Sequence, residues 1–307
     1  MKIYINKVKE SWIIDRVTNE WIQQNENSST NKIKEADIVW IIAHWVWDKI
    51  PIKYLKTKKV VASIYHIDFD NFDEKQEKDF YNLDQYVDQY HVISLKTKLQ
   101  LSTLTKKEII SIPFWVNQEN YFYKNNKTEL RRKLGFQEKD YLVGSFQRDT
   151  EGSDLISPKL IKGPDIFVNI ARDMHSKNKN LIIVLAGTRR QYVIKQLEEL
   201  GIRYKYFEMA NLEMLNNLYN VLDLYIVTSR LEGGPQAILE SAITKTPLIS
   251  TDVGVAPEIL SGESIFQPDF YEKSKPNVDY AFKNADKFKI PQGMREFNKM
   301  FNKVYEN

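Results

Sequence analysis

Two glutamates that flank a pair of glycines are the residues of this chain whose types and spacing best suit chemistry. Glu232 and Glu240 bracket Gly233 and Gly234 in the run Glu-Gly-Gly-Pro-Gln-Ala-Ile-Leu-Glu. The glycines favour a turn that opens a helix, where backbone N–H groups and the positive end of the helix dipole attract a phosphate. Carboxylates beside such a site accept hydrogen bonds from sugar hydroxyls but repel phosphate. A site for both a phosphate and a polyol indicates a sugar nucleotide.

The flanking sequence predicts the elements that position this turn. Leu222–Val227 is an apolar run typical of a buried parallel strand, and Gly234–Thr244 is predicted as the helix after the turn. Pro247–Ser250 is predicted as the next strand. In doubly wound sheets the ligand crevice lies at the carboxyl ends of the strands, and we expect the glycine turn to face such a crevice.

Short apolar strands alternate with amphipathic helices along the chain, which predicts an α/β fold of two Rossmann-like, doubly wound domains that face a central cleft. We expect an N-terminal domain over residues 1–123, a polar linker at Lys124–Thr128, and a C-terminal domain over residues 124–290. Residues 291–307 are predicted as a helix, with two placements open, on the second domain or back on the first. The other expected strands and helices are Lys2–Ile5, Trp12–Gln23, Asp37–Ala43, Lys59–Ile64, Gln89–Ile93, Ile109–Ile112, Tyr141–Phe146, Gly163–His175, Leu181–Ala186, Arg189–Leu200, Tyr204–Phe207, Leu212–Val221 and Ala256–Leu260.

Composition excludes several classes of protein. The 44 Lys and Arg residues nearly balance 41 Asp and Glu residues, so no strong field argues for nucleic acid as a partner. The chain has no cysteine, which excludes disulfides and thiolate metal sites. The N-terminus shows no signal-peptide pattern, and no apolar run approaches the roughly 20 residues that span a bilayer. We therefore expect a cytoplasmic protein.

The run Glu232–Glu240 resembles the paired-glutamate motif of the family-four retaining glycosyltransferases, the glycosyl transferases group 1, which have the GT-B fold. The resemblance extends over residues 142–260 and more weakly over residues 60–117. It implies a metal-independent enzyme of the hexosyltransferase type that moves a sugar from a UDP- or GDP-linked nucleotide sugar to a hydroxyl of a glycan or glycolipid. The acceptor would belong to cell-surface polysaccharide or lipopolysaccharide. Further segments in the family's order are Gly144-Ser-Phe-Gln-Arg148, Lys162-Gly163, Leu181-Ile-Ile-Val-Leu-Ala-Gly187 and Gly254-Val-Ala-Pro-Glu258.

The resemblance implies catalytic roles for His66, Arg148, Lys162 and Glu232. The diphosphate leaving group gains negative charge as the anomeric bond breaks, and fixed cations aimed at that charge stabilise the transition state. We expect Arg148 and Lys162 to supply these cations, and Glu232 to face the transferred sugar. Glu240 is expected on the ribose hydroxyls. The other expected donor-binding residues are Gly187, Gly233, Gly234, Pro235, Gln236 and Ala237.

Arg148 and Lys162 are separated by the segment 149–161, which is longer than the resemblance predicts. Two interpretations of this segment are open, a lid over the site and an exposed excursion. Lys159, Arg189 and Arg190 are alternative phosphate cations.

Residues at strand ends of the first domain are candidates for the acceptor side. His66 follows the apolar strand that begins at Val60 and matches the family's strand-end histidine. His44, Trp45 and Trp47 follow another apolar strand. Tryptophans there could stack on acceptor sugars, although packing is the commoner use of this residue.

Two other patterns allow alternative functions. Asp68 and Asp70 form an Asp-x-Asp pair, which binds metal in a different glycosyltransferase fold, but they also suit an acidic loop before a helix; we predict no metal site. Two lysine clusters leave two interpretations open: a solvated surface, which is the commoner one, and a peripheral contact with anionic lipid at the inner face of the membrane. The clusters are Lys53, Lys56, Lys58 and Lys59, and Lys96, Lys98, Lys106 and Lys107.

Two rival functions use the same fold. A sugar-nucleotide epimerase needs no acceptor. A non-catalytic sugar-nucleotide-binding protein keeps the donor site alone, and it is favoured by Asn6–Trp12, which stands where the family has a glycine-rich loop.

Overall fold

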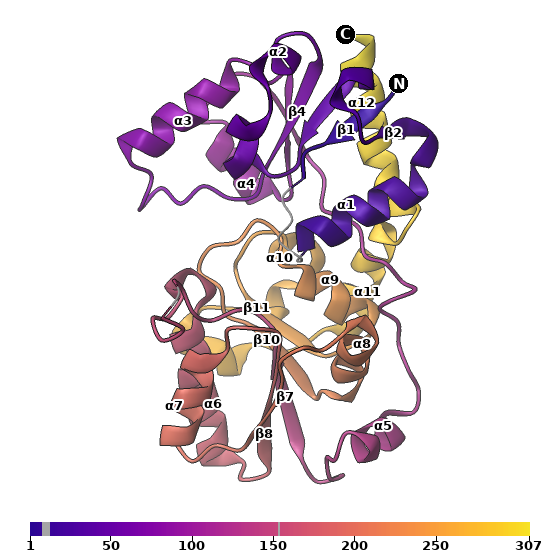
Figure 1. The fold of residues 1–307 in the computed structure, drawn as a ribbon. Helices are drawn as coiled ribbons and strands as arrows, with labels where there is room; N and C mark the ends of the chain where they lie inside the picture. Colours follow the sequence, from indigo (N-terminus) through magenta and orange to yellow (C-terminus); the bar gives the residue numbers. More distant parts are fainter. Residues whose placement is uncertain (8–12, 153) are drawn as a thin grey trace. The chain divides into compact units, whose positions relative to one another are not determined.

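The computed structural model describes residues 1–7, 13–152 and 154–307. The chain forms two compact units (Figure 1), of which the first comprises Met1–Trp115 and Ile290–Asn307 and the second Val116–Lys289. Trp12, the expected start of the first helix, lies outside the described residues. So do most of the Asn6–Trp12 segment and Ser153 of the 149–161 segment.

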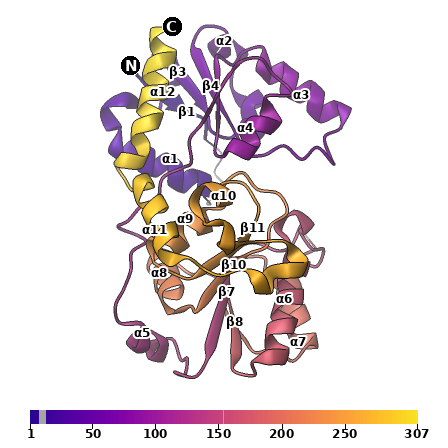
Figure 2. The same ribbon diagram turned by 180° about the vertical axis from the view of Figure 1, so that it is seen from behind.

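The first unit is built on a parallel sheet with strand order β2-β1-β3-β4-β5-β6 over the described residues. Helices α1 and α12 cover one face, and α2, α3 and α4 contribute to the core on the other (Figures 1 and 2). Because both faces are covered, the central strands are continuous apolar runs. The bounds are β1 Ile3–Ile5, α1 Ile13–Gln24, β2 Ser29–Thr30, β3 Ile38–Ile41, α2 Ile52–Leu55, β4 Lys59–Ile64, α3 Glu74–Asp84, β5 Gln89–Val92, α4 Leu95–Leu101, β6 Glu108–Ser111 and α12 Arg295–Glu306.

The C-terminal helix α12 packs on the first unit. Phe297 and Phe301 are fully buried, and the ring of Phe301 lies 5.4 Å from that of Trp21 and 5.1 Å from that of Trp40. Aromatic pairs at such distances bury a large apolar area and add a specific attraction. Of the two placements left open by the sequence, the structure has the return to the first unit.

The second unit has a parallel sheet with strand order β12-β11-β10-β7-β8-β9 over the described residues. Helices α6 and α7 lie on one side of this sheet and α8, α9 and α11 on the other (Figures 1 and 2). The bounds are α5 Lys127–Lys133, β7 Tyr141–Ser145, α6 Pro164–Lys177, β8 Leu181–Ala186, α7 Gln191–Glu199, β9 Tyr204–Phe207, α8 Leu212–Val221, β10 Leu224–Val227, α9 Gln236–Ile243, β11 Leu248–Thr251, α10 Ala256–Ile259, β12 Ile265–Phe266 and α11 Val278–Ala285.

The second unit begins at Val116, whereas the sequence placed the boundary after Tyr123 and a linker at Lys124–Thr128. Val116 N donates to Phe288 O at 2.9 Å, which ties the start of the unit to its end. Tyr121 is buried in the core of the second unit. The stretch that was expected to link the domains is therefore part of the second unit.

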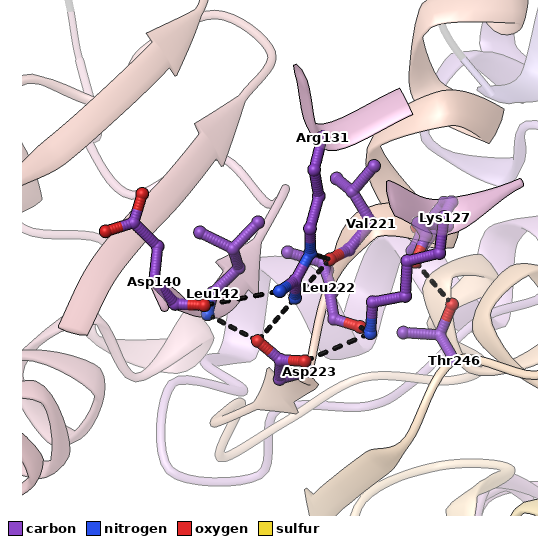
Figure 3. Close-up of polar contacts among 9 residues, drawn as sticks. Lys127, Arg131, Asp140, Leu142, Val221, Leu222, Asp223 and Thr246 are labelled. Atoms are coloured by element: carbon purple, nitrogen blue, oxygen red, sulfur yellow. Dashed lines mark hydrogen bonds and ion pairs between the residues drawn. The ribbon is translucent and has the colours of Figure 1, made fainter. Parts of the chain in front are cut away.

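Helix α5 is joined to the second unit by several polar contacts, of which the carboxylate of Asp223 receives two ion pairs. Arg131 and Lys127 point toward Asp223 from neighbouring turns of the helix (Figure 3). The guanidinium Nη2 of Arg131 lies 2.5 Å from Asp223 Oδ2, and Lys127 Nζ lies 3.0 Å from Oδ1. Asp223 also accepts from Leu142 N at 2.9 Å, so the same carboxylate joins α5 to the start of β7.

Candidate functional site

The strand order of the second unit places a topological switch point between β7 and β10. From β7 the sheet grows through β8 and β9 in one direction and through β10, β11 and β12 in the other. Ligands of doubly wound sheets bind outside the carboxyl ends of the strands at this point. The segment after β7 carries Gln147 and Arg148, and the segment after β10 carries Thr228, Ser229 and Glu232.

Lys162 and Glu232 meet in this unit although 70 positions separate them in the sequence. Lys162 Nζ lies 2.5 Å from Glu232 Oε1, with side chains 23% and 14% exposed. The Ser229 hydroxyl donates to the same Oε1 at 3.0 Å. Two donors therefore fix the orientation of the Glu232 carboxylate, and its partial burial strengthens the ion pair relative to one in water.

Gln147, in the segment after β7, contacts both the segment after β10 and the segment that carries Lys162. Its amide nitrogen donates to Lys162 O at 2.7 Å, and its amide oxygen lies 3.1 Å from the Ser229 hydroxyl. The Thr228 hydroxyl also donates to Lys162 O at 3.3 Å. The backbone of Lys162 is thus held from the ends of both β7 and β10. Gln147 was part of a motif quoted from the sequence and Ser229 was not, and the type of neither residue indicated this bridging role.

Gly163 allows the approach of the Lys162 segment to β10. Its φ is +63°, in the left-handed region, and it forms the N-cap of α6. A Cβ at this position would lie 1.9 Å from Thr228 O. The lysine–glycine pair therefore combines a cation with the residue that lets the backbone come close enough to present it.

The glycine turn is packed against a second glycine loop. A Cβ on Gly254, whose φ is +47°, would lie 2.3 Å from Gly233 O. The Thr251 hydroxyl donates to Ser229 O at 2.6 Å. Pro235 is the N-cap of α9, so Gln236 and Ala237 form its first turn. The turn is held from β11 as well as β10.

Glu240 lies inside the unit, with 7% of its surface exposed. The Tyr219 hydroxyl donates to Glu240 Oε2 at 2.8 Å. Burial, followed by the charge of Glu240, raises the pKa of Tyr219 well above its usual value, which keeps the hydroxyl protonated as a donor. The ring of Tyr225 lies 5.3 Å from that of Tyr219. Tyr219 was not expected at the site because its sequence position is that of a helix core residue.

The segment between Arg148 and Lys162 is anchored by a buried ion pair. Arg190 Nε lies 3.0 Å from Asp149 Oδ2, with side chains 1% and 2% exposed. Burial lowers the pKa of Arg190, and the charge of Asp149 opposes that shift. Arg190 also donates to Gln147 O. Arg190 is therefore an internal anchor, whereas Arg148 and Lys159 are half-buried.

The other expected donor residue, Gly187, follows β8 with a φ of +84°. Its carbonyl accepts from the Tyr206 hydroxyl at 3.0 Å, and its N–H donates to Phe207 O at 3.2 Å. Arg189, close behind it, donates to Gly152 O. This turn therefore holds the loop after β8 to β9 and to the 149–161 segment.

In the first unit, His44 and His66 follow neighbouring strands, β3 and β4. Burial lowers the pKa of His44 to about 4, and the charge of His66 acts in the same direction. His44 Nδ1 lies 3.1 Å from Ser63 O. Because a carbonyl only accepts, Nδ1 carries the proton and Nε2 is left as an acceptor.

The structure separates the two tryptophans considered for the acceptor. Trp47 is 8% exposed and its indole N–H donates to Asp79 Oδ1 at 3.2 Å, which makes it a packing residue. Trp45 is 44% exposed, and its ring lies 5.3 Å from that of His44 and 5.7 Å from that of Tyr65. Trp45 therefore remains the candidate for stacking on a sugar.

The Asp-x-Asp segment forms a loop and leads to a helix start. Asn71 donates to Asp68 Oδ2 at 2.8 Å, and Asp73 caps α3 by accepting from Gln76 N at 2.8 Å. Within residues 1–7, 13–152 and 154–307, no group of three or more His, Cys, Asp or Glu side chains could hold a metal ion. No helix in the described part of the chain is long and apolar enough to cross a membrane.

Comparison with known proteins relates the chain to glycosyltransferases. LpsB of Rhizobium meliloti (strain 1021), a lipopolysaccharide core biosynthesis mannosyltransferase, is 24% identical over 146 residues, which are 45% of this chain and 39% of that protein. The match thus spans well under half of that relative's length. The model of the glycosyl transferases group 1 family matches residues 126–289.

Solved glycosyltransferase structures share the fold over nearly the whole chain. Anabaena HepE in complex with UDP has a TM-score of 0.77 at 13% identity and covers 99% of this chain and 100% of its own. The lipopolysaccharide outer core galactosyltransferase WaaB has a TM-score of 0.67 at 15% identity, with coverage of 99% and 100%. These likenesses, with the two parallel sheets, confirm the predicted GT-B fold.

The predicted family is confirmed as well. The matched residues carry the lysine–glycine pair, the paired glutamates and the glycine loop that packs on them, and they make up more than half of the chain. This protein belongs to the glycosyl transferases group 1 family.

Proposed function

We propose that this glycosyltransferase is a retaining enzyme that transfers a hexose from a nucleoside diphosphate sugar to a hydroxyl of a glycan or glycolipid. The observation that carries the proposal is the ion pair of Lys162 and Glu232 at the switch point, held by Ser229 and Gln147. Retention of the anomeric configuration is carried over from the family resemblance.

Cations at the switch point can stabilise the negative charge of the diphosphate leaving group. As the anomeric bond breaks, the diphosphate takes the electron pair and gains negative charge. Lys162 and Arg148 stabilise that charge in this proposal, and no proton transfer to the diphosphate is required. Glu232 holds the Lys162 ammonium in place before the donor binds, which lowers the cost of ordering a flexible lysine. Since the cations come from side chains, we propose that the reaction needs no metal.

In this proposal, two carboxylates accept hydrogen bonds from the hydroxyl groups of the donor. Glu232 accepts from hydroxyls of the transferred sugar, and Glu240 accepts from the ribose. Tyr219 keeps the Glu240 carboxylate in one orientation through its hydrogen bond. The backbone of the glycine turn at Gly233 and Gly234 contacts the donor phosphates.

The kinds of substrate are supported by relatives of the chain. HepE structures contain UDP and, in another crystal, UDP-glucose. LpsB and WaaB are named for transfers in lipopolysaccharide synthesis. We propose a UDP- or GDP-linked hexose as donor and a lipopolysaccharide or surface polysaccharide precursor as acceptor. His66 and Trp45 contact the transferred sugar and the acceptor in this proposal.

A peripheral contact with anionic lipid would bring the enzyme to a lipid-linked acceptor. Helix α4 exposes Leu95 and Leu99, which are 54% and 71% exposed, beside Lys96 and Lys98. Exposed leucines among lysines suit the headgroup region of an anionic bilayer. Replacing Leu99 and Lys98 by Asp and Glu should abolish co-sedimentation with vesicles of phosphatidylglycerol, and unchanged co-sedimentation would contradict the contact.

Transfer kinetics test the catalytic assignment. Lys162→Met and Glu232→Gln should lower kcat by about 100-fold or more in a protein that stays folded, because each removes a group aimed at the transition state. Lys195→Met, an exposed lysine of α7, is the matched control and should keep wild-type activity. Full activity in Lys162→Met would refute the role of Lys162. Hydrolysis or epimerisation of the donor without acceptor would favour the rival functions.

A further inference from the structure

Residues 149–152 and 154–159, the described residues of this segment, run out from the sheet and back again as a hairpin, called here the 149–159 hairpin. Thr150 and Pro158 form an antiparallel bridge, and Glu151 N donates to Ser157 O at 2.9 Å. At its neck, Lys159 N donates to Asp149 O at 2.8 Å. The two ends of the hairpin are therefore adjacent, and Lys159 lies beside Asp149, the residue that follows Arg148.

The neck of the hairpin is fixed to the sheet. The buried ion pair of Asp149 and Arg190 holds one strand of the neck, and Asp149 N donates to Arg189 O at 3.0 Å. Arg190 also binds Gln147 O, next to the end of β7. A buried pair of this kind is rigid because breaking it would leave an uncompensated charge. The position of Lys159 is thus set by the same strand end that carries Arg148.

The hairpin also leads directly to Lys162. Lys162 N donates to Lys159 O at 2.8 Å across the short 3₁₀ turn Leu160–Lys162. Burial lowers the pKa of Lys159, and the charges of Arg148 and Lys162 lower it further, while Glu151 and Glu232 oppose the shift. Lys159 therefore lies within electrostatic reach of both cations assigned to the diphosphate.

Glu151 and Glu232 offset part of the cost of placing a half-buried lysine next to two other cations, and a bound anion would offset more of it. Lysines are mostly extended into solvent, where like charges are screened. Here the hairpin neck and the 3₁₀ turn hold Lys159 near Arg148 and Lys162. A diphosphate carries several unesterified oxygens and can accept from more than two cations at once.

We propose that Lys159, delivered by the 149–159 hairpin, is a third cation for the diphosphate of the donor. This inference rests on the proposed function. It assigns the extra segment between Arg148 and Lys162 a role in donor binding: the segment folds back on itself, so that Lys159, the last residue of the hairpin, lies beside Asp149 and adds a cation to Arg148 and Lys162.

Binding of nucleoside diphosphates and monophosphates tests the proposal. Isothermal titration calorimetry of the wild type with UDP, GDP, UMP and GMP identifies the base of the nucleotide that binds. Lys159→Met, which keeps the aliphatic stem, should then weaken binding of the matching diphosphate about 10-fold and of the monophosphate about twofold or less. Lys159→Gln, a second neutral variant, should match Lys159→Met. Lys159→Arg should restore most of the affinity. Lys195→Met is the control and should bind as wild type.

The outcomes separate the inference from the function on which it rests. Diphosphate affinity unchanged in Lys159→Met but lost in Lys162→Met would overturn the role of Lys159 and leave the proposed function standing. An equal loss for monophosphate and diphosphate would also overturn it, because the cation would then not discriminate the second phosphate. Failure of the wild type to bind any nucleoside diphosphate would refute the proposed function itself.

Discussion

Gly163 and Gly201 form a matched pair that isolates the close approach of the Lys162 segment to β10. Their φ values are +63° and +64°, so alanine meets the same backbone strain of about 1–2 kcal/mol at either position. At Gly201 the added methyl group has nothing within 4 Å. At Gly163 it would lie 1.9 Å from Thr228 O, where real Cβ contacts stay beyond 3.0 Å.

Gly163→Ala must therefore move backbone by about 1 Å, and overpacking of this kind costs about 1–3 kcal/mol more. We expect Gly163→Ala to be less stable than Gly201→Ala by that amount, which corresponds to a melting temperature lower by about 2–12 °C. Because Lys162 moves with Gly163, nucleoside diphosphate affinity should fall in Gly163→Ala alone. Scanning calorimetry and titration calorimetry measure the two effects. Equal melting temperatures and equal affinities in the two variants would contradict the close approach of Gly163 to Thr228.

Three further predictions concern groups outside the glycine pair. Asp149→Asn leaves the buried guanidinium of Arg190 without a counter-charge and should destabilise the protein by about 3–5 kcal/mol in urea unfolding; a change below about 1 kcal/mol would contradict a buried pair. Burial lowers the pKa of His91 to about 4, below its unfolded value near 6.5. Since the unfolded chain binds the proton more readily, the stability contributed by neutral His91 is fully present above about pH 6.5 and is lost as the pH falls toward 4. His91→Asn should flatten this pH dependence of stability, and an unchanged slope would show that His91 does not cause it. Trp45→Ala should raise the acceptor KM about 10-fold and leave the donor KM unchanged; an unaltered acceptor KM would exclude stacking on Trp45.

Local sequence patterns were sufficient for most of the fold. The strands Lys59–Ile64, Leu181–Ala186 and Tyr204–Phe207 have the bounds expected from their apolar runs, and so does the helix Leu212–Val221. The position of the C-terminal helix could not be predicted in this way. The apolar stripe that contains Phe297 is the same whichever unit it packs against.

The candidate site was predicted only in part, because its geometry depends on contacts between distant residues. The motifs identified Lys162 and Glu232, but their ion pair arises from the fold of two loops. Asp149 and Arg190 were not recognised as a buried pair, since charged side chains are usually exposed.

We propose above that the second unit binds a nucleoside diphosphate through Lys162 without a metal. The most direct measurement is a thermal-shift titration of wild type and Lys162→Met with UDP, GDP, ADP and CDP, with and without EDTA. We expect the melting temperature to rise with the concentration of the diphosphate of one base, and this rise to be insensitive to EDTA and lost in Lys162→Met. A rise that requires a divalent metal, or that persists in Lys162→Met, would contradict it.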